Sequence, residues 1–177
     1  MNPGIAELCD ELIIDDINNP QNAGRYAKEI NATLAIIGPE NPLANGVSDT
    51  LWDLGIPTIG PKKNLAQIEA SKSFTRNLQK TYQISGSPIY RHFKSMEGVS
   101  GFLKKLGDNY VVKYDGLAGG KGVKVSGDHL KNHRAAIEYC DNLIQKGSTF
   151  LIEEKFIGEE FSLMSFCDGT NIKHMPA

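Results

Sequence analysis

The clearest pattern of hydrophobic and polar positions lies in the middle of the chain, where two apolar segments flank a glycine-rich run. The apolar residues 110–112 lead into Lys113, and Val123 and Val125 alternate with polar neighbours after the glycines. Short segments of this kind, separated by glycines, are typical of paired strands. The sequence therefore predicts a strand, a tight loop and a second strand, arranged as a hairpin.

The loop of this hairpin has the composition of a phosphate-binding loop. Glycines leave backbone N–H groups uncovered and permit positive φ, while Lys113 and Lys121 bring cationic charge. The loop is not a Walker A motif, because Asp115 and Gly122 stand where that motif needs a glycine and a hydroxyl residue. An ordinary hairpin with two solvated lysines is the alternative that the loop alone leaves open.

The first third of the chain has the order of a βαβ unit. A short, β-branched apolar strand is predicted at 34–37, a helix from Pro42 to Leu54, and a second strand at 56–60. Ligands of open α/β sheets sit beyond the carboxyl ends of the strands, which here are residues 38–42 and 60–61. A Gly-Pro turn can also simply end a strand. These residues alone do not decide between a ligand-binding loop and a turn that only ends the strand.

The rest of the chain alternates between helical and strand spacing. Helices are predicted over residues 64–82, 95–106 and 128–146, and strands over 87–90, 149–156, 159–167 and 171–175. Paired carboxylates such as Glu153 and Glu154 at a strand end can serve a metal, a ribose or acid/base chemistry, although alone such groups are usually solvated.

The histidines offer no metal site. His129 and His133 are four positions apart, but the H-E-x-x-H glutamate and a third ligand are missing, so we predict exposed helix histidines. Arg91 and His92 have no nucleophile or carboxylate partner that the sequence identifies, and they receive no role.

Composition narrows the class of protein. The 177 residues are 40% hydrophobic, which is enough to form a core. The net charge of −2 and the pI near 6.1 do not indicate a basic surface for binding nucleic acid or an anionic membrane. No apolar run approaches the roughly 18 residues of a membrane helix, and the N-terminus does not read as a secretion signal. Cys9, Cys140 and Cys167 are odd in number and far apart, which predicts reduced, packed thiols in a cytoplasmic protein.

Taken in order, these pieces resemble the ATP-grasp superfamily and, within it, the phosphoribosylamine-glycine ligase (glycinamide ribonucleotide synthetase) family. The motifs that carry the resemblance are NPGIA at 2–6, GPENPL at 38–43, GP at 60–61, AQIEASKSF at 66–74, VVKYDGLAGGKGV at 111–123, and the segment 153–164. The combination runs along nearly the whole chain and is far more specific than any single motif.

The resemblance implies a role for particular residues. Lys72 and Lys113 would contact ATP phosphates, the loop from Gly116 to Gly122 would fold over the triphosphate, and Glu160 would hold the ribose hydroxyls. The adenine edge would meet Glu153 and the backbone of Phe156. The full implied ATP set is Lys72, Lys113, Gly116, Gly119, Gly120, Lys121, Gly122, Glu153, Glu154, Phe156 and Glu160. The phosphoribosylamine pocket would include Gly38, Pro39, Glu40, Asn41 and Pro42.

The resemblance also implies an activity. Members join glycine to 5-phosphoribosylamine through glycyl phosphate, giving glycinamide ribonucleotide, ADP and phosphate in de novo purine biosynthesis. ATP is the cosubstrate, with Mg²⁺ as the metal and Mn²⁺ as its alternative. We expect small-molecule substrates in the cytoplasm, with no nucleic-acid or membrane partner, and the oligomeric state is left open.

The expected fold combines α/β and α+β parts. A partial open parallel sheet, residues 1–63, would bind substrate, and residues 64–177 would form the first part of an ATP-grasp domain, with a lid subdomain at about 88–153. Tyr114, Gly119 and Lys155 depart mildly from the family pattern.

The ends of the chain depart from the family pattern more strongly. The chain starts after the family's first strand and glycine-rich loop, and it stops before the family's metal-binding Glu and Asn. We therefore expect an inactive fragment with no metal ligand and no assigned catalytic residue, and with an exposed sheet edge and apolar surface in its opening region. Another ATP-grasp carboxylate-amine ligase and a non-catalytic nucleotide-binding fragment are the alternatives.

Overall fold

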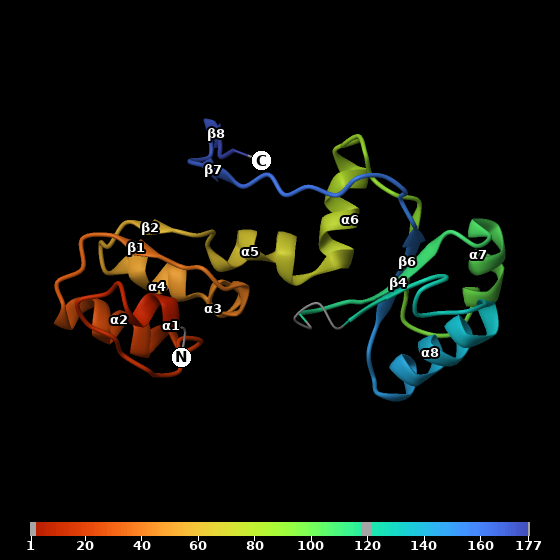
Figure 1. The fold of residues 1–177 in the computed structure, drawn as a ribbon, viewed down its shortest axis with the longest axis horizontal. Helices are drawn as coiled ribbons and strands as arrows, with labels where there is room; N and C mark the ends of the chain where they lie inside the picture. The colour runs from red at the N-terminus through yellow and green to blue at the C-terminus, as the bar shows by residue number, and fades with distance from the viewer. Residues whose placement is uncertain (1–2, 118–121, 177) are drawn as a thin grey trace.

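The computed structural model describes residues 3–117 and 122–176 (Figure 1). Its N-terminal part is a small α/β unit built on two short parallel strands. In chain order its elements are α1 (Pro3–Ala6), α2 (Pro20–Glu29), β1 (Ala35–Ile36), α3 (Glu40–Asn45), α4 (Val47–Asp53) and β2 (Thr58–Ile59). The strands pair Ala35 with Thr58 and Ile36 with Ile59, which confirms the predicted βαβ crossover.

The core of this unit lies where α2 and α4 meet the strands. Its buried members are Ala27, Val47, Leu51 and Ile56. Large apolar side chains also remain in contact with solvent, and the exposed fractions are 90% for Leu8 and 71% for Ile36. The expected exposure of apolar surface in the opening region is therefore confirmed.

The predicted helix from Pro42 to Leu54 is interrupted at Gly46. This residue has φ of +94°, a left-handed conformation that ends α3 and starts α4. Glycine adopts it without the steric cost that a β-carbon adds, which is why the helix breaks at this position. The prediction of one continuous helix was wrong.

A similar break divides the predicted helix 64–82 into α5 (Lys63–Ala70) and α6 (Lys72–Thr81). Between them Ser71 is extended, with φ of −129°, and its Oγ accepts a hydrogen bond from Phe74 N at 3.2 Å. A serine hydroxyl that satisfies a first-turn N–H is a strong N-cap, so α6 begins anew here. Figure 1 shows α5 and α6 as two helices that meet at an angle.

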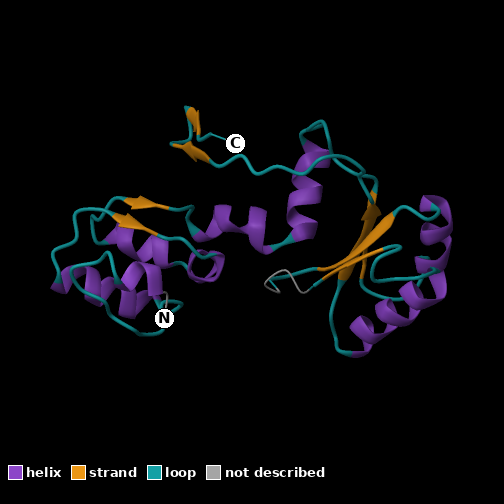
Figure 2. Ribbon diagram, in the orientation of Figure 1, coloured by secondary structure: helices purple, strands orange, loops and turns teal. Residues whose placement is uncertain are grey.

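The C-terminal part is organised around an antiparallel sheet of strand order β3-β6-β4-β5 (Figure 2). Its elements are β3 (Tyr90–Phe93), α7 (Val99–Leu106), β4 (Tyr110–Tyr114), β5 (Val123–Val125), α8 (His133–Gln145) and β6 (Phe150–Glu154). The predicted glycine-rich hairpin is confirmed as β4 and β5, paired from Val111 and Val125 to Lys113 and Val123.

Helices α7 and α8 cover one face of this sheet, and α6 lies on the other side (Figure 1). The core between the sheet and its covering helices is built from hydrophobic side chains, with the Tyr110 hydroxyl as a buried polar group. Its buried members are Phe93, Val99, Leu103, Tyr110, Val112, Leu130, Ala136, Cys140, Phe150 and Ile152. Cys140 is packed and reduced as predicted, whereas Cys9 is half-buried and Cys167 is exposed, so the prediction of packed thiols fails for Cys167.

Several boundaries differ from the sequence prediction, among them the starts of β3, α7 and α8. Strand β3 begins at Tyr90 rather than at residue 87, and helix α7 begins at Val99 rather than at residue 95. Helix α8 begins at His133, where Asn132 Oδ1 accepts from Ala135 N at 3.0 Å, and not at Asp128. Residues 126–130 form a turn instead, in which Gly127 N donates to Leu130 O.

The chain ends in a small exposed hairpin, β7 (Ser165–Cys167) and β8 (Ile172–His174). Asp168 closes its turn, because Oδ1 accepts from Asn171 N at 2.6 Å and from Thr170 N at 2.8 Å. These backbone donors, together with the Asn171 side chain, lower the pKa of the Asp168 carboxyl to about 2. The predicted strand 159–167 is shorter than expected.

Among the described residues, no helix combines the length and apolar character needed to cross a membrane.

Candidate functional site

The two faces of the antiparallel sheet have opposite chemistry, and the strand register explains why. Residues directly opposite each other in antiparallel strands share a face. Glu153 pairs with both Val111 and Tyr90, and Lys113 pairs with Leu151, so Glu153 and Lys113 share one face. The alternate residues, such as Ile152, point into the core under α7 and α8. The charged face is therefore the one that α6 approaches.

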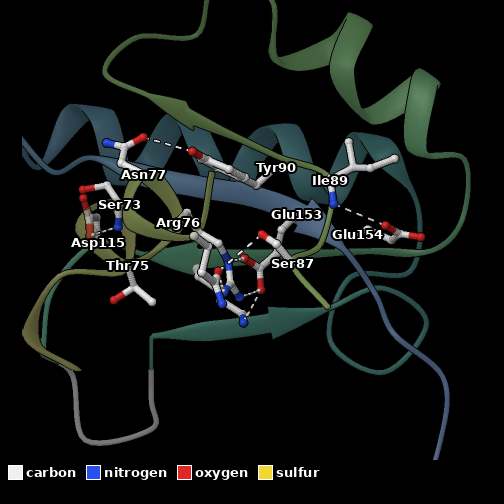
Figure 3. A network of polar contacts seen from close by, with 12 residues as sticks. Ser73, Thr75, Arg76, Asn77, Ser87, Ile89, Tyr90, Asp115, Glu153 and Glu154 are labelled. Carbon is white, nitrogen blue, oxygen red and sulfur yellow. Dashed lines mark hydrogen bonds and ion pairs between the residues drawn. The ribbon is translucent and has the colours of Figure 1, made fainter. Parts of the chain in front are cut away.

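A buried carboxylate stands at the centre of that face. Arg76 reaches Glu153 from α6, with Nε donating to Oε2 at 2.8 Å and Nη2 donating to Oε1 at 3.1 Å (Figure 3). Lys113 Nζ forms an ion pair with Oε1 of the same carboxylate. The Glu153 side chain is only 4% exposed, against 18% for Arg76 and 25% for Lys113. The structure thus joins α6, β4 and β6 through one three-residue charge cluster.

The cluster holds Glu153 in its ionised form. Burial alone would raise the pKa of this carboxyl, but the hydrogen bonds and charges of Arg76 and Lys113 outweigh that effect and lower the pKa below its usual value. Gln79 orients the guanidinium, because its Oε1 accepts from Arg76 Nη1 at 2.8 Å. With two cations and one anion, the cluster carries one excess positive charge.

A further lysine stands at the base of the glycine hairpin. Lys72 is the first residue of α6, and its Nζ donates to Gly116 O at 2.8 Å. Lys72 and Arg76 are four positions apart, so they lie on one side of the helix. Tyr114 N donates to Gly122 O at 2.8 Å and closes the strand pair. The structure therefore gathers Lys72, Lys113, Gly116 and Glu153 from the predicted ATP set.

Glu154, Phe156 and Glu160 from the predicted ATP set are not in this cluster. Glu154 lies on the opposite face from Glu153, and its Oε2 accepts from Ile89 N at 3.2 Å (Figure 3). Phe156 and Glu160 follow β6 in an exposed segment. Gly119, Gly120 and Lys121 lie outside the described residues.

The predicted substrate residues lie in the N-terminal unit, after β1. Gly38, Pro39 and Pro42 line a hollow of about 280 Å³. Glu40 starts α3, and Asn41 is exposed within it. Because β1 and β2 are parallel and in register, the Gly-Pro turns that follow them lie at the same end of the sheet, as the sequence predicts.

An open cleft of about 640 Å³ lies beside the charge cluster, between α6 and β3. Asn77 and Tyr90 line it, and the Tyr90 hydroxyl donates to Asn77 Oδ1 at 2.9 Å. The residues that line this cleft include neither Lys113 nor Glu153. The charge cluster, rather than the cleft, therefore defines the candidate site.

Sequence reasoning missed Arg76, Asp115 and His92. Arg76 could have been found from its helical spacing with Lys72, which the sequence shows. The sequence identified no carboxylate partner for His92, but in the structure its Nε2 lies 3.4 Å from Asp115 Oδ2. The pairing joins β3 to the end of β4 and has no signal in local sequence.

The histidine prediction near α8 also needs correction. His129 lies in the turn before the helix, where its Nδ1 accepts from Val125 N at 3.3 Å. His133 is helical but half-buried, with Nε2 2.8 Å from Gly107 O. Both side chains therefore have local structural contacts, and they are not a pair of exposed helix histidines.

Comparison with known proteins identifies the family. Residues 70–177 match the family described as Phosphoribosylglycinamide synthetase, ATP-grasp (A) domain, and residues 1–69 match the corresponding N domain. The chain belongs to the phosphoribosylglycinamide synthetase family. The family and fold predictions from the sequence are therefore confirmed.

The relatives show how much of a family member this chain represents. It is 48% identical to the phosphoribosylamine-glycine ligase of Methanosarcina acetivorans over 99% of this chain and 40% of the relative. The Methanococcus maripaludis ligase is 45% identical, over 99% of this chain and 41% of the relative. The chain thus spans about two fifths of the length of these relatives.

Solved structures agree on the fold. The phosphoribosylamine-glycine ligase of Thermotoga maritima superposes with a TM-score of 0.64 at 27% identity, covering 80% of this chain and 34% of that one. D-alanine-D-alanine ligase from Bacillus anthracis, solved in complex with ATP, gives a TM-score of 0.61 at 21% identity, covering 97% of this chain and 62% of the other. The similarity to D-alanine-D-alanine ligase concerns the fold alone.

Proposed function

We propose that this chain carries the nucleotide-binding part of a ligase that joins glycine to 5-phosphoribosylamine with consumption of ATP. The observation that carries the proposal is the shared face of Lys113 and Glu153, with Lys72 at the base of the adjacent hairpin. The relatives named phosphoribosylamine-glycine ligase support the choice of substrates.

The proposed reaction has two steps. The glycine carboxylate attacks the γ-phosphorus of ATP, which gives glycyl phosphate and releases ADP. The amine of 5-phosphoribosylamine then attacks the acyl carbon, the C–O bond to phosphate breaks, and glycinamide ribonucleotide and phosphate leave. Phosphoryl transfer of this kind depends mainly on positioning and on neutralising charge.

The charges of the site suit a polyphosphate. The Arg76, Lys113 and Glu153 cluster has one excess positive charge, and Lys72 adds another beside it. Cations held in a partly buried site interact with phosphate more strongly than solvated ones do. We assign Lys72 and Lys113 to the phosphates on this basis.

Glu153 retains capacity for one more donor. A carboxylate has about four lone-pair sites, and three are taken by Arg76 and Lys113. The remaining site on Oε2 suits the amino group of adenine. In the same pose, the Phe156 backbone would follow the adenine edge and Glu160 would meet the ribose hydroxyls. Because the Glu154 side chain lies on the opposite face, Glu154 would contact the nucleotide through its backbone.

The remaining assignments follow the family. Residues 1–63, with Gly38 to Pro42, would bind 5-phosphoribosylamine. Residues 64–177 would form the nucleotide domain with a lid subdomain at about 88–153, in a cytoplasmic enzyme. Mg²⁺ accompanies ATP in this chemistry. Within residues 3–117 and 122–176, no three His, Cys, Asp or Glu side chains come together as a candidate metal site.

Calorimetric titration with Mg-ATP tests the proposal. We expect saturable binding by the unaltered chain, and a loss of about tenfold or more in affinity for Lys113→Ala, because a charge-assisted phosphate contact is removed. Lys131→Ala is the matched control, since Lys131 is exposed between the turn at 126–130 and the start of α8. Circular dichroism confirms that each variant is folded. No binding by the folded, unaltered chain would refute the proposal.

A further inference from the structure

We propose that Asp115 is a positioning residue that sets the spacing between Lys72 and Lys113, by fastening the end of β4 to the first turn of α6. This inference deepens the function proposed above and rests on it for the identity of the ligand. The fastening itself is a property of the chain alone and can be measured without nucleotide.

Two hydrogen bonds join the first turn of α6 to the residues that follow β4. Asp115 Oδ1 accepts from Ser73 N at 3.1 Å (Figure 3), and Lys72 Nζ donates to Gly116 O at 2.8 Å. Lys72 and Ser73, which are neighbours on the helix, therefore contact Gly116 and Asp115, which are neighbours after the strand. Ser71 Oγ lies 3.5 Å from the same Asp115 oxygen and adds a weaker contact.

The carboxylate also has a histidine close to its other oxygen, without a hydrogen bond between them. The Asp115 side chain is 10% exposed, and its Oδ2 lies 3.4 Å from His92 Nε2. Its own backbone N donates to Thr149 O at 3.1 Å, which fixes the residue beside the start of β6. A nearly buried carboxylate is costly unless it is hydrogen-bonded, and the first turn of a helix supplies N–H donors that lack partners within the helix. Each group therefore satisfies the other.

The consequence concerns the two lysines. Lys72 directly precedes Ser73 on α6, and Lys113 is two residues before Asp115 on β4. The contact between Asp115 and Ser73 bridges a sequence separation of 42 positions. Two cations on separate elements can bind one polyphosphate tightly only if their separation is set before binding, since otherwise ordering them costs free energy. Asp115 supplies that order without touching the ligand.

A purely structural role makes a different prediction. If Asp115 only capped α6, its loss would weaken the whole chain and reduce the binding of every ligand in proportion. If Asp115 sets the lysine spacing, its loss would reduce the binding of ligands with several phosphates and leave the nucleoside contribution unchanged. The contrast between ATP and AMP separates these two roles.

The first measurement is hydrogen exchange at the Ser73 amide, read by NMR without nucleotide. We expect exchange at least about tenfold faster in Asp115→Ala, since the hydrogen bond from this amide to a carboxylate is lost. Asp115→Asn keeps an oxygen acceptor and should change the rate less than about twofold. Asp10→Ala, at an exposed carboxylate, is the control. Unchanged protection in Asp115→Ala would overturn the inference. If that variant does not fold, Asp115→Ser, whose hydroxyl is too short to replace the contact, takes its place.

The second measurement is competition of ATP and AMP against a fluorescent ATP analogue. We expect Asp115→Ala to lose about tenfold in ATP affinity and less than about twofold in AMP affinity, with Asp115→Asn close to the unaltered chain. Equal losses for both ligands, or an unchanged ratio, would overturn the inference while leaving the proposed function intact. A complete absence of ATP binding by the unaltered chain would instead overturn the proposed function, and the exchange rates would still decide whether Asp115 fastens the helix.

Discussion

The guanidinium of Arg76 and the carboxylate of Glu153 meet through two hydrogen bonds, although the residues are 77 positions apart in the chain. The pair fixes α6 against β6, and Lys113 joins it from β4. Paired, hydrogen-bonded geometry is what makes a buried charge tolerable, and removal of one partner leaves the other uncompensated. The stability of this face therefore depends on the charges that also define the candidate site.

Replacement of Arg76 should be costly. We expect Arg76→Met, which keeps much of the side-chain volume, to lower the free energy of unfolding by about 3 kcal/mol, because Glu153 would keep only Lys113 as a charged partner. Urea denaturation followed by circular dichroism measures the change. Arg134→Met is the control, since Arg134 and its partner Glu138 are 89% and 64% exposed. That variant should stay within about 0.5 kcal/mol of the unaltered chain.

A double variant checks the cause. In Arg76→Met combined with Glu153→Gln, the buried negative charge is gone, so part of the lost stability should return. Additive losses from the two substitutions would show that packing, rather than charge, explains the effect of Arg76→Met.

Stability should also depend on pH through Glu153. Its pKa is lowered in the folded chain from the ordinary value of about 4.5, so as the pH falls through that value the unfolded state binds more protons than the folded state. The contribution of Glu153 is thus fully present above about pH 5 and is lost as the pH falls through the folded pKa. Urea midpoints measured from pH 7 to pH 3 should fall less steeply in Glu153→Gln. The pH dependence that remains in Glu153→Gln includes the contribution of Asp168. Its pKa of about 2 is the same in this variant and in the unaltered chain. Identical slopes would contradict this prediction.

The cysteines should differ sharply in reactivity. Burial raises the pKa of the Cys140 thiol to about 12, and the side chain is fully buried in the core under α8. We therefore expect alkylation at pH 8 to modify the exposed Cys167 quickly and Cys140 only when the chain unfolds, because the thiolate is the reactive species. Mass spectrometry of peptides after timed alkylation gives both rates. Equal rates in the folded chain would show that the core around α8 opens readily.

The junction between α5 and α6 should depend on the Ser71 hydroxyl. Ser71→Ala removes the acceptor for Phe74 N, and loss of such an N-cap costs about 1 kcal/mol. Thermal unfolding monitored by circular dichroism measures the loss. Ser100→Ala, at an exposed position in α7, should be neutral or slightly stabilising because alanine favours the helix. A neutral Ser71→Ala variant would mean that α6 is held in place by its tertiary contacts alone.

The sequence predicted the elements whose signals are local. The hairpin of β4 and β5 follows from two short apolar segments around glycines, and the βαβ order follows from strand and helix lengths. The breaks at Gly46 and Ser71 also have local sequence signals, which are a glycine suited to positive φ and a serine suited to an N-cap. They were missed because hydrophobic spacing continues across both positions, and periodicity alone cannot report a change of backbone conformation at one residue.

The site was predicted less completely because its contacts are not local. Lys113 and Glu153 were each implied by the family resemblance, and the register of β4 with β6 is what brings them together. Asp115 gains its role from α6 folding back over the sheet, which no short window of sequence contains, whereas the local signal for Arg76 is its helical spacing with Lys72. Roles proposed for Glu154, Phe156 and Glu160 stay predictions.

The alternation of residues along β6 restricts how the chain can change in length. Ile152 points into the core and Glu153 into the charged face, and both depend on one register with β3 and β4. Insertion or deletion of a single residue within β6 would exchange the two faces, placing a carboxylate among aromatic rings and an isoleucine beside Arg76. Point substitutions can damage one face at a time, whereas a change of length damages both at once. The exposed segment 156–164 after β6 pairs with no strand and carries no such double constraint from sheet packing.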